Sequence, residues 1–307
     1  MPPTPADFAD ALVLTGPTGA GKSAVALELA DRLGCEIVAM DSMTLYRGMD
    51  IGTAKPTAEE RARVPHHLID VLDPWESGSV AWWLDRADEA CRLIRSRGKR
   101  PLFVGGTPFY LKALTCGLFD APPVDPPIRA GLEAEADQLG PVALHRRLAE
   151  VDPLTAARLH PNDVRRVVRA LEVFVATGRP ISSFQRTWAA PDTHARIPCV
   201  MLDWPRDELY RRIDARVDAM LAAGWVDEVR RLAADPRGMG KEASQALGYR
   251  ELRLHLDNGG DRAATVAEIK TRTRQFAKRQ LTWFRHLPGC VPVPPAKGSL
   301  IERLLKS

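Results

Sequence analysis

The stretch that decides the fold is ALVLTGPTGAGKS, residues 11–23 of a chain of 307 residues. The apolar run 11–15 predicts a buried strand, and the apolar spacing over 23–33 predicts a helix that Gly34 ends. Between the two, the sequence fits G-x-x-x-x-G-K-[ST] without a mismatch. A phosphate-binding loop is therefore predicted, made of Gly16, Pro17, Thr18, Gly19, Ala20, Gly21, Lys22 and Ser23. In such a loop the lysine reaches terminal phosphates and the serine holds Mg²⁺.

The same strand–helix alternation continues along the chain. Further strands are predicted at 36–40, 101–104 and 197–203, and long helices at 82–97, 209–232 and 265–286. Residues 121–127 (APPVDPP) hold four prolines and mark a boundary, after which the sequence to about residue 188 is helical and rich in arginine. We therefore expect an α/β fold: a P-loop-containing parallel sheet core with flanking helices, from residues 1–124 plus 191–307, and a helical insertion domain at 125–190.

Composition narrows the class of protein. With 45% hydrophobic and 27% charged residues, the chain is neither a disordered tail nor a disulfide-stapled miniprotein. No run approaches the roughly 18 apolar residues of a membrane span, the N-terminus does not resemble a secretory signal, and the five cysteines form no metal-binding spacing. The cytoplasm is the expected compartment and no membrane partner is expected.

Charge is divided unequally along the chain. Residues 1–120 hold 13 basic and 16 acidic residues, whereas residues 121–307 hold 30 and 23. Most of the basic residues are arginines, which suit phosphate and base recognition. The pattern is compatible with a nucleic-acid partner, and equally with solvated charged faces.

Two aspartates follow apolar strands and could organise Mg²⁺ beside the loop. Asp41 follows EIVAM and Asp203 follows CVML, and the pattern alone does not choose between them. A carboxylate at the carboxyl end of a parallel strand faces the ligand crevice, so Asp41 could also act as a general base. The structural alternative for Asp41 is a helix cap or a turn.

An ordered set of motifs runs over residues 16–285. It comprises GPTGAGKS (16–23), DSMTLYRGMDIGTAKP (41–56), HHLID (66–70), VGGTPFYLKAL (104–114), NDVRRVVRALEV (162–173), LDWPR with RRIDARVDAML and GW (202–225), QALGYRE (245–251) and TRQFAKRQLTWFR (273–285). This set resembles the bacterial tRNA dimethylallyltransferase (IPP transferase) family. The loop motif is shared by many unrelated enzymes, whereas the 41–56 block is far more specific.

The resemblance implies an activity and a set of site residues. The family transfers a dimethylallyl group from dimethylallyl diphosphate to N6 of adenosine 37 in tRNA, so the loop would hold a prenyl diphosphate with Mg²⁺. By similarity, Asp41 accepts the proton of the adenine amino group, and Thr18 and Arg216 contact the diphosphate. Without the resemblance, Arg216 could instead form a helix-surface ion pair with Asp214 or Asp218.

The tRNA partner would be its anticodon stem–loop, and the enzyme a monomer. The residues that resemble tRNA contacts are Asp41, Ser42, Met43, Thr44, Thr107, Arg129, Arg165, Arg166, Val167, Val168, Arg169, Gln245, Ala246, Leu247, Gly248, Tyr249, Arg250, Lys278, Arg279, Gln280, Leu281, Thr282, Trp283, Phe284 and Arg285. At least one of Trp283 and Phe284 is expected in the core instead. The arginines at 165–169 could also be a solvated basic helix offset by Glu172.

Two positions depart from the family pattern. Thr44 stands where many members have Gln, and Pro108-Phe109 replaces Gly-Leu. The first change leaves the role of position 44 in base contact open, and the second should stiffen the turn after Thr107.

The alternatives to prenyl transfer are a P-loop kinase of a small metabolite and a non-enzymatic RNA-binding P-loop switch. A kinase of this size would need a lid with phosphate-clamping arginines soon after the core, and a switch would not need the 41–56 block.

Overall fold

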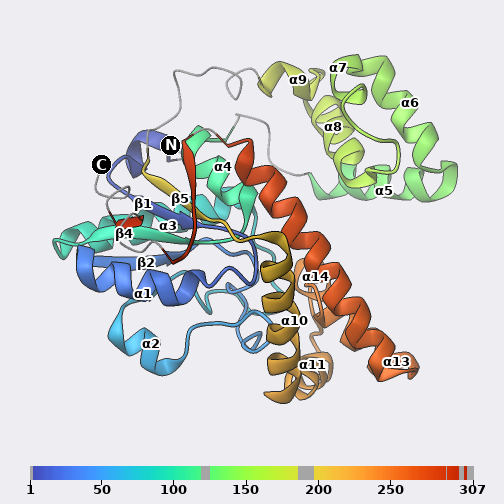
Figure 1. The fold of residues 1–307 in the computed structure, drawn as a ribbon. Coiled ribbons are helices and arrows are strands. Elements are labelled where there is room, and N and C mark those ends of the chain that lie inside the picture. Colours follow the sequence, from blue (N-terminus) through green and yellow to red (C-terminus); the bar gives the residue numbers. More distant parts are fainter. Residues whose placement is uncertain (1–2, 119–124, 186–196, 288, 297–300, 303–307) are drawn as a thin grey trace. The chain divides into compact units, whose positions relative to one another are not determined.

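The computed structural model describes residues 3–118, 125–185, 197–287, 289–296 and 301–302. By its internal contacts the chain divides into two compact units. Unit 1 combines residues 1–115 with 195–307, and unit 2 comprises residues 116–194. Figure 1 shows the labelled elements of each unit.

Unit 1 is built on a six-stranded sheet in which every neighbouring pair of strands is parallel. The strand order is β3-β2-β4-β1-β5-β6. The strands are β1 Leu12–Thr15, β2 Cys35–Ala39, β3 His66–His67, β4 Arg100–Gly105, β5 Cys199–Leu202 and β6 Cys290–Val293. The predicted parallel core is confirmed, and its central strands were predictable because strands buried on both faces appear as apolar runs.

Helices α1 (Lys22–Leu33) and α3 (Val80–Ser96) pack against opposite faces of this sheet. Successive side chains of a strand point to opposite faces, and β4 illustrates the division. Leu102 belongs to the core cluster that includes the apolar face of α1. Phe103, the next residue, instead meets the rings of Trp83 in α3 and Phe8 edge to face. The loops after β1, β2 and β4 therefore emerge together at the carboxyl edge of a sheet covered on both sides, where α/β proteins bind ligands.

Unit 1 also contains a 3₁₀ helix and seven further α-helices among the described residues. They are the 3₁₀ helix Pro5–Phe8, α2 Ala58–Arg63, α4 Pro108–Cys116, α10 Arg206–Ala222, α11 Trp225–Ala233, α12 Lys241–Ser244, α13 Tyr249–Asn258 and α14 Arg262–Arg285. In the described part of the chain, none of the helices combines the length and apolar character needed to cross a membrane.

The single helix predicted at 209–232 is wrong, because the structure contains two helices there. Helix α10 ends at Ala222, and Gly224 adopts a left-handed conformation (φ 96°) before α11 begins at Trp225. Glycine adopts this conformation without steric cost. The turn carries Trp225 into the interior, where it is 2% exposed. Apolar spacing continued across this break, so the sequence pattern alone did not reveal it.

Unit 2 is helical, with its own core. Its helices are α5 Pro126–Leu139, α6 Pro141–Val151, α7 Pro153–Ala156, α8 Val164–Thr177 and α9 Ile181–Phe184. Helix α8 buries Val167, Val168 and Leu171 in a cluster with Leu132 and Leu148 of the preceding helices. The predicted boundary segment 121–127 and the end of the predicted insertion at 190 fall largely outside the described residues.

Candidate functional site

The phosphate-binding loop joins β1 to α1 at the carboxyl edge of the sheet. Gly16, Gly19 and Gly21 all have positive φ values (147°, 81° and 84°). A Cβ on Gly19 would lie 2.9 Å from Cγ1 of Ile213, so this turn also requires glycine for its close approach to α10. The loop leads into the amino-terminal turn of a helix of 12 residues, which together with the loop N–H groups favours an anion.

Three charged side chains share the surroundings of this loop. The Lys22 ammonium donates to the carbonyl oxygens of Gly16 and Pro17, each at 3.0 Å. Burial lowers the pKa of Lys22 to about 8, with the positive charge of Arg216 acting in the same direction and Asp41 opposing both. Burial also lowers the pKa of the Arg216 guanidinium, again opposed by Asp41. The predicted diphosphate and base residues are thus close enough to interact electrostatically.

Arg216 does not form the ion pair that was its structural alternative. Asp214 pairs with Arg274 of α14 at 2.7 Å, and Asp218 pairs with Lys270 of the same helix. These contacts tie α10 to α14. Among the described residues, neither aspartate is therefore the ion-pair partner of Arg216.

One turn before Arg216, Arg212 supports the loop directly. Its Nε donates to the Gly19 carbonyl at 3.0 Å, and its guanidinium lies 4.4 Å from the Trp204 ring centre. The Trp204 indole N–H donates to the Ala20 carbonyl at 2.9 Å. Sequence reasoning placed neither Arg212 nor Trp204 in the site, although the i, i+4 spacing of Arg212 and Arg216 was visible.

Asp41 lies just beyond the end of β2, in a turn. Its Oδ1 accepts from the backbone N–H of Met43 at 2.9 Å, which matches the turn alternative. In the described structure this is the one hydrogen bond that the carboxylate accepts, so its other oxygen is open to a further donor. Thr107, at the end of the loop after β4, holds the next residue by accepting from the Ser42 N–H at 3.1 Å. The geometry is therefore compatible with a turn and a base at the same residue.

The two departures from the family pattern have local explanations. The Thr44 hydroxyl donates to the Asp41 carbonyl at 3.2 Å, and its side chain is buried. The predicted contact of Thr44 with tRNA is therefore not available to its side chain. Pro108 is the first residue of α4, a position where the missing N–H removes no helical hydrogen bond.

The residues present would fit a Mg²⁺ held partly by a bound diphosphate, the ligand that the resemblance implies. Among the described residues, no group of three or more His, Cys, Asp or Glu side chains is arranged to hold a metal ion. Mg²⁺ at phosphate sites is usually bound by one or two protein ligands together with substrate phosphates and water. Ser23 is exposed in the first turn of α1, where it can supply such a ligand. Asp203 has a buried Oδ1 without a hydrogen-bond partner, 3.7 Å from an Arg285 nitrogen.

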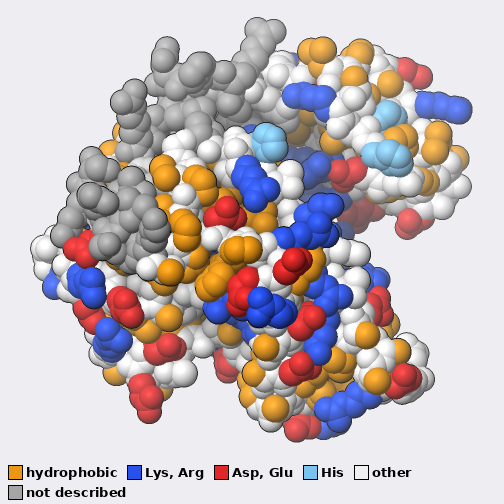
Figure 2. Space-filling model, in the orientation of Figure 1, with side chains coloured by type: hydrophobic (Ala, Val, Ile, Leu, Met, Phe, Trp, Pro, Cys, Tyr) orange, Lys and Arg blue, Asp and Glu red, His pale blue; other side chains and the backbone are white. Residues whose placement is uncertain are grey.

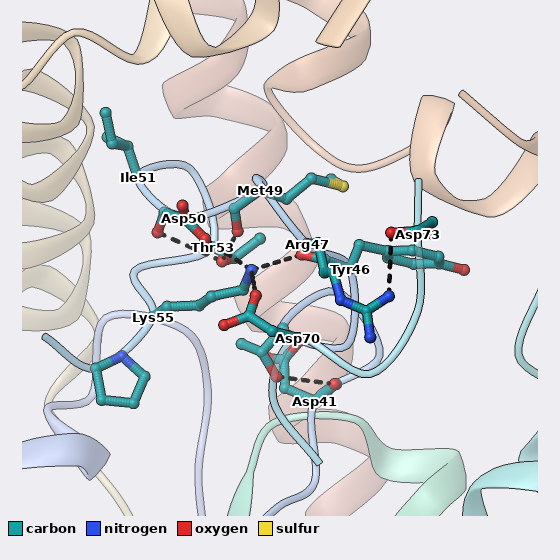
Figure 3. A network of polar contacts seen from close by, with 12 residues as sticks. Asp41, Tyr46, Arg47, Met49, Asp50, Ile51, Thr53, Lys55, Asp70 and Asp73 are labelled. Carbon is teal, nitrogen blue, oxygen red and sulfur yellow. Dashed lines mark hydrogen bonds and ion pairs between the residues drawn. The ribbon is translucent and has the colours of Figure 1, made fainter. Parts of the chain in front are cut away.

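The specific block at 41–56 forms a loop that folds around Lys55 (Figure 3). The Lys55 side chain is 2% exposed, and its ammonium contacts the Tyr46 carbonyl, Asp50 and Asp70. Asp70 also accepts from Arg61 at 2.7 Å. Partial burial opposes ionisation of Asp70, but the hydrogen bonds from Lys55 and Arg61 hold its pKa below the ordinary value. The 41–56 and HHLID motifs are therefore joined into one structure by a buried cation.

The same loop is anchored to the QALGYR segment through Glu228 of α11. The Glu228 carboxylate accepts from the backbone N–H groups of Asp50, Ile51 and Gly52 at 2.9, 2.8 and 3.2 Å. It also accepts from the Tyr249 hydroxyl at 2.6 Å. Burial, reinforced by this carboxylate, raises the pKa of the Tyr249 phenol. Four donors from two distant motifs thus converge on one buried acid.

Trp225 fills the space between these two motifs. A Cβ on Gly52 would lie 2.1 Å from its indole nitrogen, and a Cβ on Gly248 would lie 2.0 Å from its ring. Both glycines are therefore required by packing. Ala246, Gly248 and Tyr249 are buried, so the side chains of Ala246 and Tyr249 do not reach the surface. The exposed residues of this segment are Gln245 and Arg250.

Helix α14 presents the other predicted tRNA residues of unit 1. Lys278, Arg279, Thr282, Trp283 and Arg285 are exposed, and Figure 2 shows Lys and Arg side chains along this part of the surface. Phe284 is fully buried and Trp283 is 37% exposed, which confirms that one of the two is a core residue. Gln280 is 3% exposed, so its side chain lies in the interior and not on the surface where a tRNA contact was predicted. Met43, Leu247 and Leu281 are partly buried.

In unit 2 the predicted arginines have two different environments. Arg165 and Arg166 are exposed, with Arg166 paired to Asp163 at 3.1 Å. Arg129 and Arg169 instead pair at 2.9 and 2.8 Å with Glu172, whose side chain is 1% exposed. Val167 and Val168 lie in the core of the unit, so their side chains cannot contact tRNA.

Comparison with known proteins gives a consistent result. Residues 44–287 match the model of the IPP transferase family, and residues 9–70 match that of isopentenyl transferase. The chain is 50% identical over 274 residues to a tRNA dimethylallyltransferase of Geobacter metallireducens, covering 89% of each sequence. It is 52% identical over 289 residues to one of Methylibium petroleiphilum, covering 91% of this chain and 87% of the relative.

Solved structures show the same similarity. A full-length tRNA isopentenylpyrophosphate transferase from Bacillus halodurans superposes with a TM-score of 0.70 at 38% identity, covering 97% of this chain and 96% of the other. A eukaryotic dimethylallyltransferase described as acting on tRNA superposes with a TM-score of 0.75 at 28% identity, covering 93% and 74%.

Proposed function

We propose, from the premise that this chain belongs to the tRNA dimethylallyltransferase family, that it transfers a dimethylallyl group from dimethylallyl diphosphate to N6 of adenosine 37 in tRNA. The observation that carries the proposal is the position of Asp41. Its carboxylate interacts electrostatically with Lys22 and Arg216 beside a phosphate-binding loop. A carboxylate at this place can take the proton of an amine that attacks carbon beside the loop. A kinase would use such a base as well, and the match to the tRNA dimethylallyltransferase family over most of the chain favours prenyl transfer.

The loop and its cations would bind the diphosphate and stabilise it as it leaves. In the transfer step the C–O bond to the allylic carbon breaks, and its electron pair departs with the diphosphate. The loop N–H groups, Lys22 and Arg216 are fixed donors for the negative charge that develops there. Mg²⁺, when bound with Ser23 as one ligand, would add further charge neutralisation.

Asp41 would act at the other end of the reaction. As the exocyclic nitrogen of adenine forms its bond to the allylic carbon, one of its protons passes to the open carboxylate oxygen of Asp41. The turn that holds Oδ1 and the Thr107 bond to Ser42 fix the carboxylate in place. The base must leave the anticodon loop to reach this carboxylate, so base flipping is part of the proposal.

The exposed basic residues are suited to the anticodon stem–loop. RNA loops are recognised through arginines and stacking rings, and Arg165, Arg166, Arg279 and Trp283 offer both on exposed surface. We assign tRNA binding to the 125–190 insertion as well as to α14. The proposal also includes that the enzyme is a monomer and acts in the cytoplasm.

Transfer of label tests this function directly. The protein is incubated with unmodified tRNA, radiolabelled dimethylallyl diphosphate and Mg²⁺, and label in the tRNA is measured. The expected result is label confined to adenosine 37. ATP hydrolysis or phosphorylation of a small molecule without label in the tRNA would favour the kinase alternative instead. tRNA binding without either reaction would favour the non-enzymatic switch.

A further inference from the structure

Gln280 connects the phosphate loop to the loop that follows β4. Its side-chain oxygen accepts from the backbone N–H of Thr18 at 2.9 Å. Its side-chain nitrogen donates to the Gly106 carbonyl at 2.5 Å. The side chain comes from the middle of α14 and is 3% exposed, while Arg279 beside it is exposed. A single buried amide thus joins three segments that are far apart in the sequence.

The Gln280 amide and the Lys22 ammonium both lie close to the backbone of Gly106. A Cβ on Gly106 would lie 2.7 Å from the Gln280 nitrogen and 3.4 Å from the Lys22 ammonium. Glycine at this position therefore allows the amide and the lysine to approach the same backbone. A glutamine that faced tRNA would not require this arrangement.

The connection extends from the diphosphate residues to the base. Gly106 precedes Thr107, whose hydroxyl holds the Ser42 N–H and whose own N–H donates to the Met40 carbonyl at 3.2 Å. Asp41 lies between Met40 and Ser42, the two residues that Thr107 holds. A shift of Gly106 would therefore displace the backbone that carries Asp41, and a shift of Thr18 would displace the phosphate loop.

We propose that Gln280 is a positioning residue of the transfer reaction, which fixes the phosphate loop and the Asp41 turn at a set separation through its two hydrogen bonds. The part of this proposal that concerns Asp41 rests on the proposed function, in which Asp41 is the base. Gln280 touches neither substrate in this assignment. It acts through Thr18 and through the Gly106–Thr107 backbone.

Gln280→Met tests the proposal, because methionine has a similar shape but makes neither bond. Gln275→Met on an exposed face of α14 is the matched control. Three quantities are measured at 20 °C: the affinity for inorganic pyrophosphate with Mg²⁺, the affinity for an unmodified anticodon stem–loop, and the single-turnover transfer rate at saturating substrates. Loss of hydrogen bonds to buried backbone groups should weaken pyrophosphate binding and slow transfer, each by about tenfold. Stem–loop affinity should stay within about twofold of wild type.

Each other outcome is informative. Unchanged pyrophosphate affinity and transfer rate, with only a lower melting temperature, would overturn the proposal in favour of a structural role. Weaker stem–loop binding alone would restore the tRNA-contact assignment and overturn it as well. If Gln280→Met does not fold by circular dichroism, Gln280→Glu decides: it retains the acceptor for Thr18 but cannot donate to Gly106. A folded Gln280→Glu should show the same two losses, and failure of both variants to fold would overturn the proposal.

Failure of the proposed function is separately visible. In that case the wild-type protein gives no transfer, while its pyrophosphate affinity still reports on Gln280. The two ideas therefore do not depend on one measurement.

Discussion

Replacing Glu228 should destabilise unit 1 by an amount that follows from its four donors. Glu228→Gln preserves the shape and converts one oxygen into an NH₂ group. With the NH₂ placed toward Tyr249, the phenol oxygen can accept from it, and Asp50 and Ile51 keep their acceptor. Only the Gly52 N–H, whose bond is the longest at 3.2 Å, then loses its partner. The Gly52 N–H loses its hydrogen bond, and the N–H groups of Asp50 and Ile51 keep an acceptor that is neutral instead of charged. Together these changes should lower the free energy of unfolding by about 2 kcal/mol.

Urea unfolding followed by far-UV circular dichroism measures this change. Glu228→Ala removes all acceptors and should cost about 4 kcal/mol, because three backbone N–H groups and one hydroxyl are left unpaired. Asp227→Asn is the control, since Asp227 is the exposed neighbour on α11 and pairs only with Arg230 in the described structure. That variant should change the free energy by less than about 0.5 kcal/mol. If Glu228→Gln matches Asp227→Asn, the loop at 50–52 is not held by this carboxylate and the reasoning fails.

Three further predictions concern the site itself. Asp41→Asn should slow single-turnover transfer by about 10²- to 10⁴-fold while stem–loop affinity is retained, since an amide cannot take the proton; loss of binding alone would make Asp41 structural. Pyrophosphate affinity, measured by calorimetry, should fall as the pH rises above about 8, because Lys22 is charged below that pH and neutral above it. Lys22→Met should remove this dependence, and a pH dependence that survived would assign it elsewhere. Arg165→Ala should weaken stem–loop binding and reduce the slope of log K against log salt by about 0.7 if the arginine neutralises one phosphate; an unchanged slope would mean a solvated surface residue.

The fold was predictable where burial produces a clear pattern. Strands β1, β2, β4 and β5 appear as apolar runs because helices cover both faces of the sheet. Strand β3 has two residues, and β6 (CVPV) contains a proline and two exposed residues, so neither has such a pattern. The break at Gly224 was missed for a different reason: apolar positions continue through it, and only its left-handed conformation ends the helix.

The site was predictable as far as local chemistry determines a role. The phosphate loop is a contiguous pattern, and Asp41 follows a recognisable strand. Arg212, Trp204, Glu228 and Gln280 act through contacts across long stretches of sequence, which a one-dimensional pattern does not contain. Motif membership also does not distinguish an exposed residue from a buried one. This is why Tyr249, Val167 and Phe284 were grouped with tRNA contacts although each lies in a core.

The ion pairs around Glu172 determine how a mutational scan of unit 2 should be interpreted. Arg129 and Arg169 both neutralise this buried acid, which also accepts from the Asp125 N–H at 2.9 Å. Removing one partner of a buried pair costs about 3–5 kcal/mol when the other charge is left unpaired. A smaller cost is expected at Glu172, because the second arginine and the Asp125 N–H remain. An alanine at either arginine would therefore destabilise unit 2, and a loss of RNA binding in such a variant would not by itself show a contact between that arginine and RNA. Only arginines outside this triad, such as Arg165, can map the RNA footprint by simple loss of affinity.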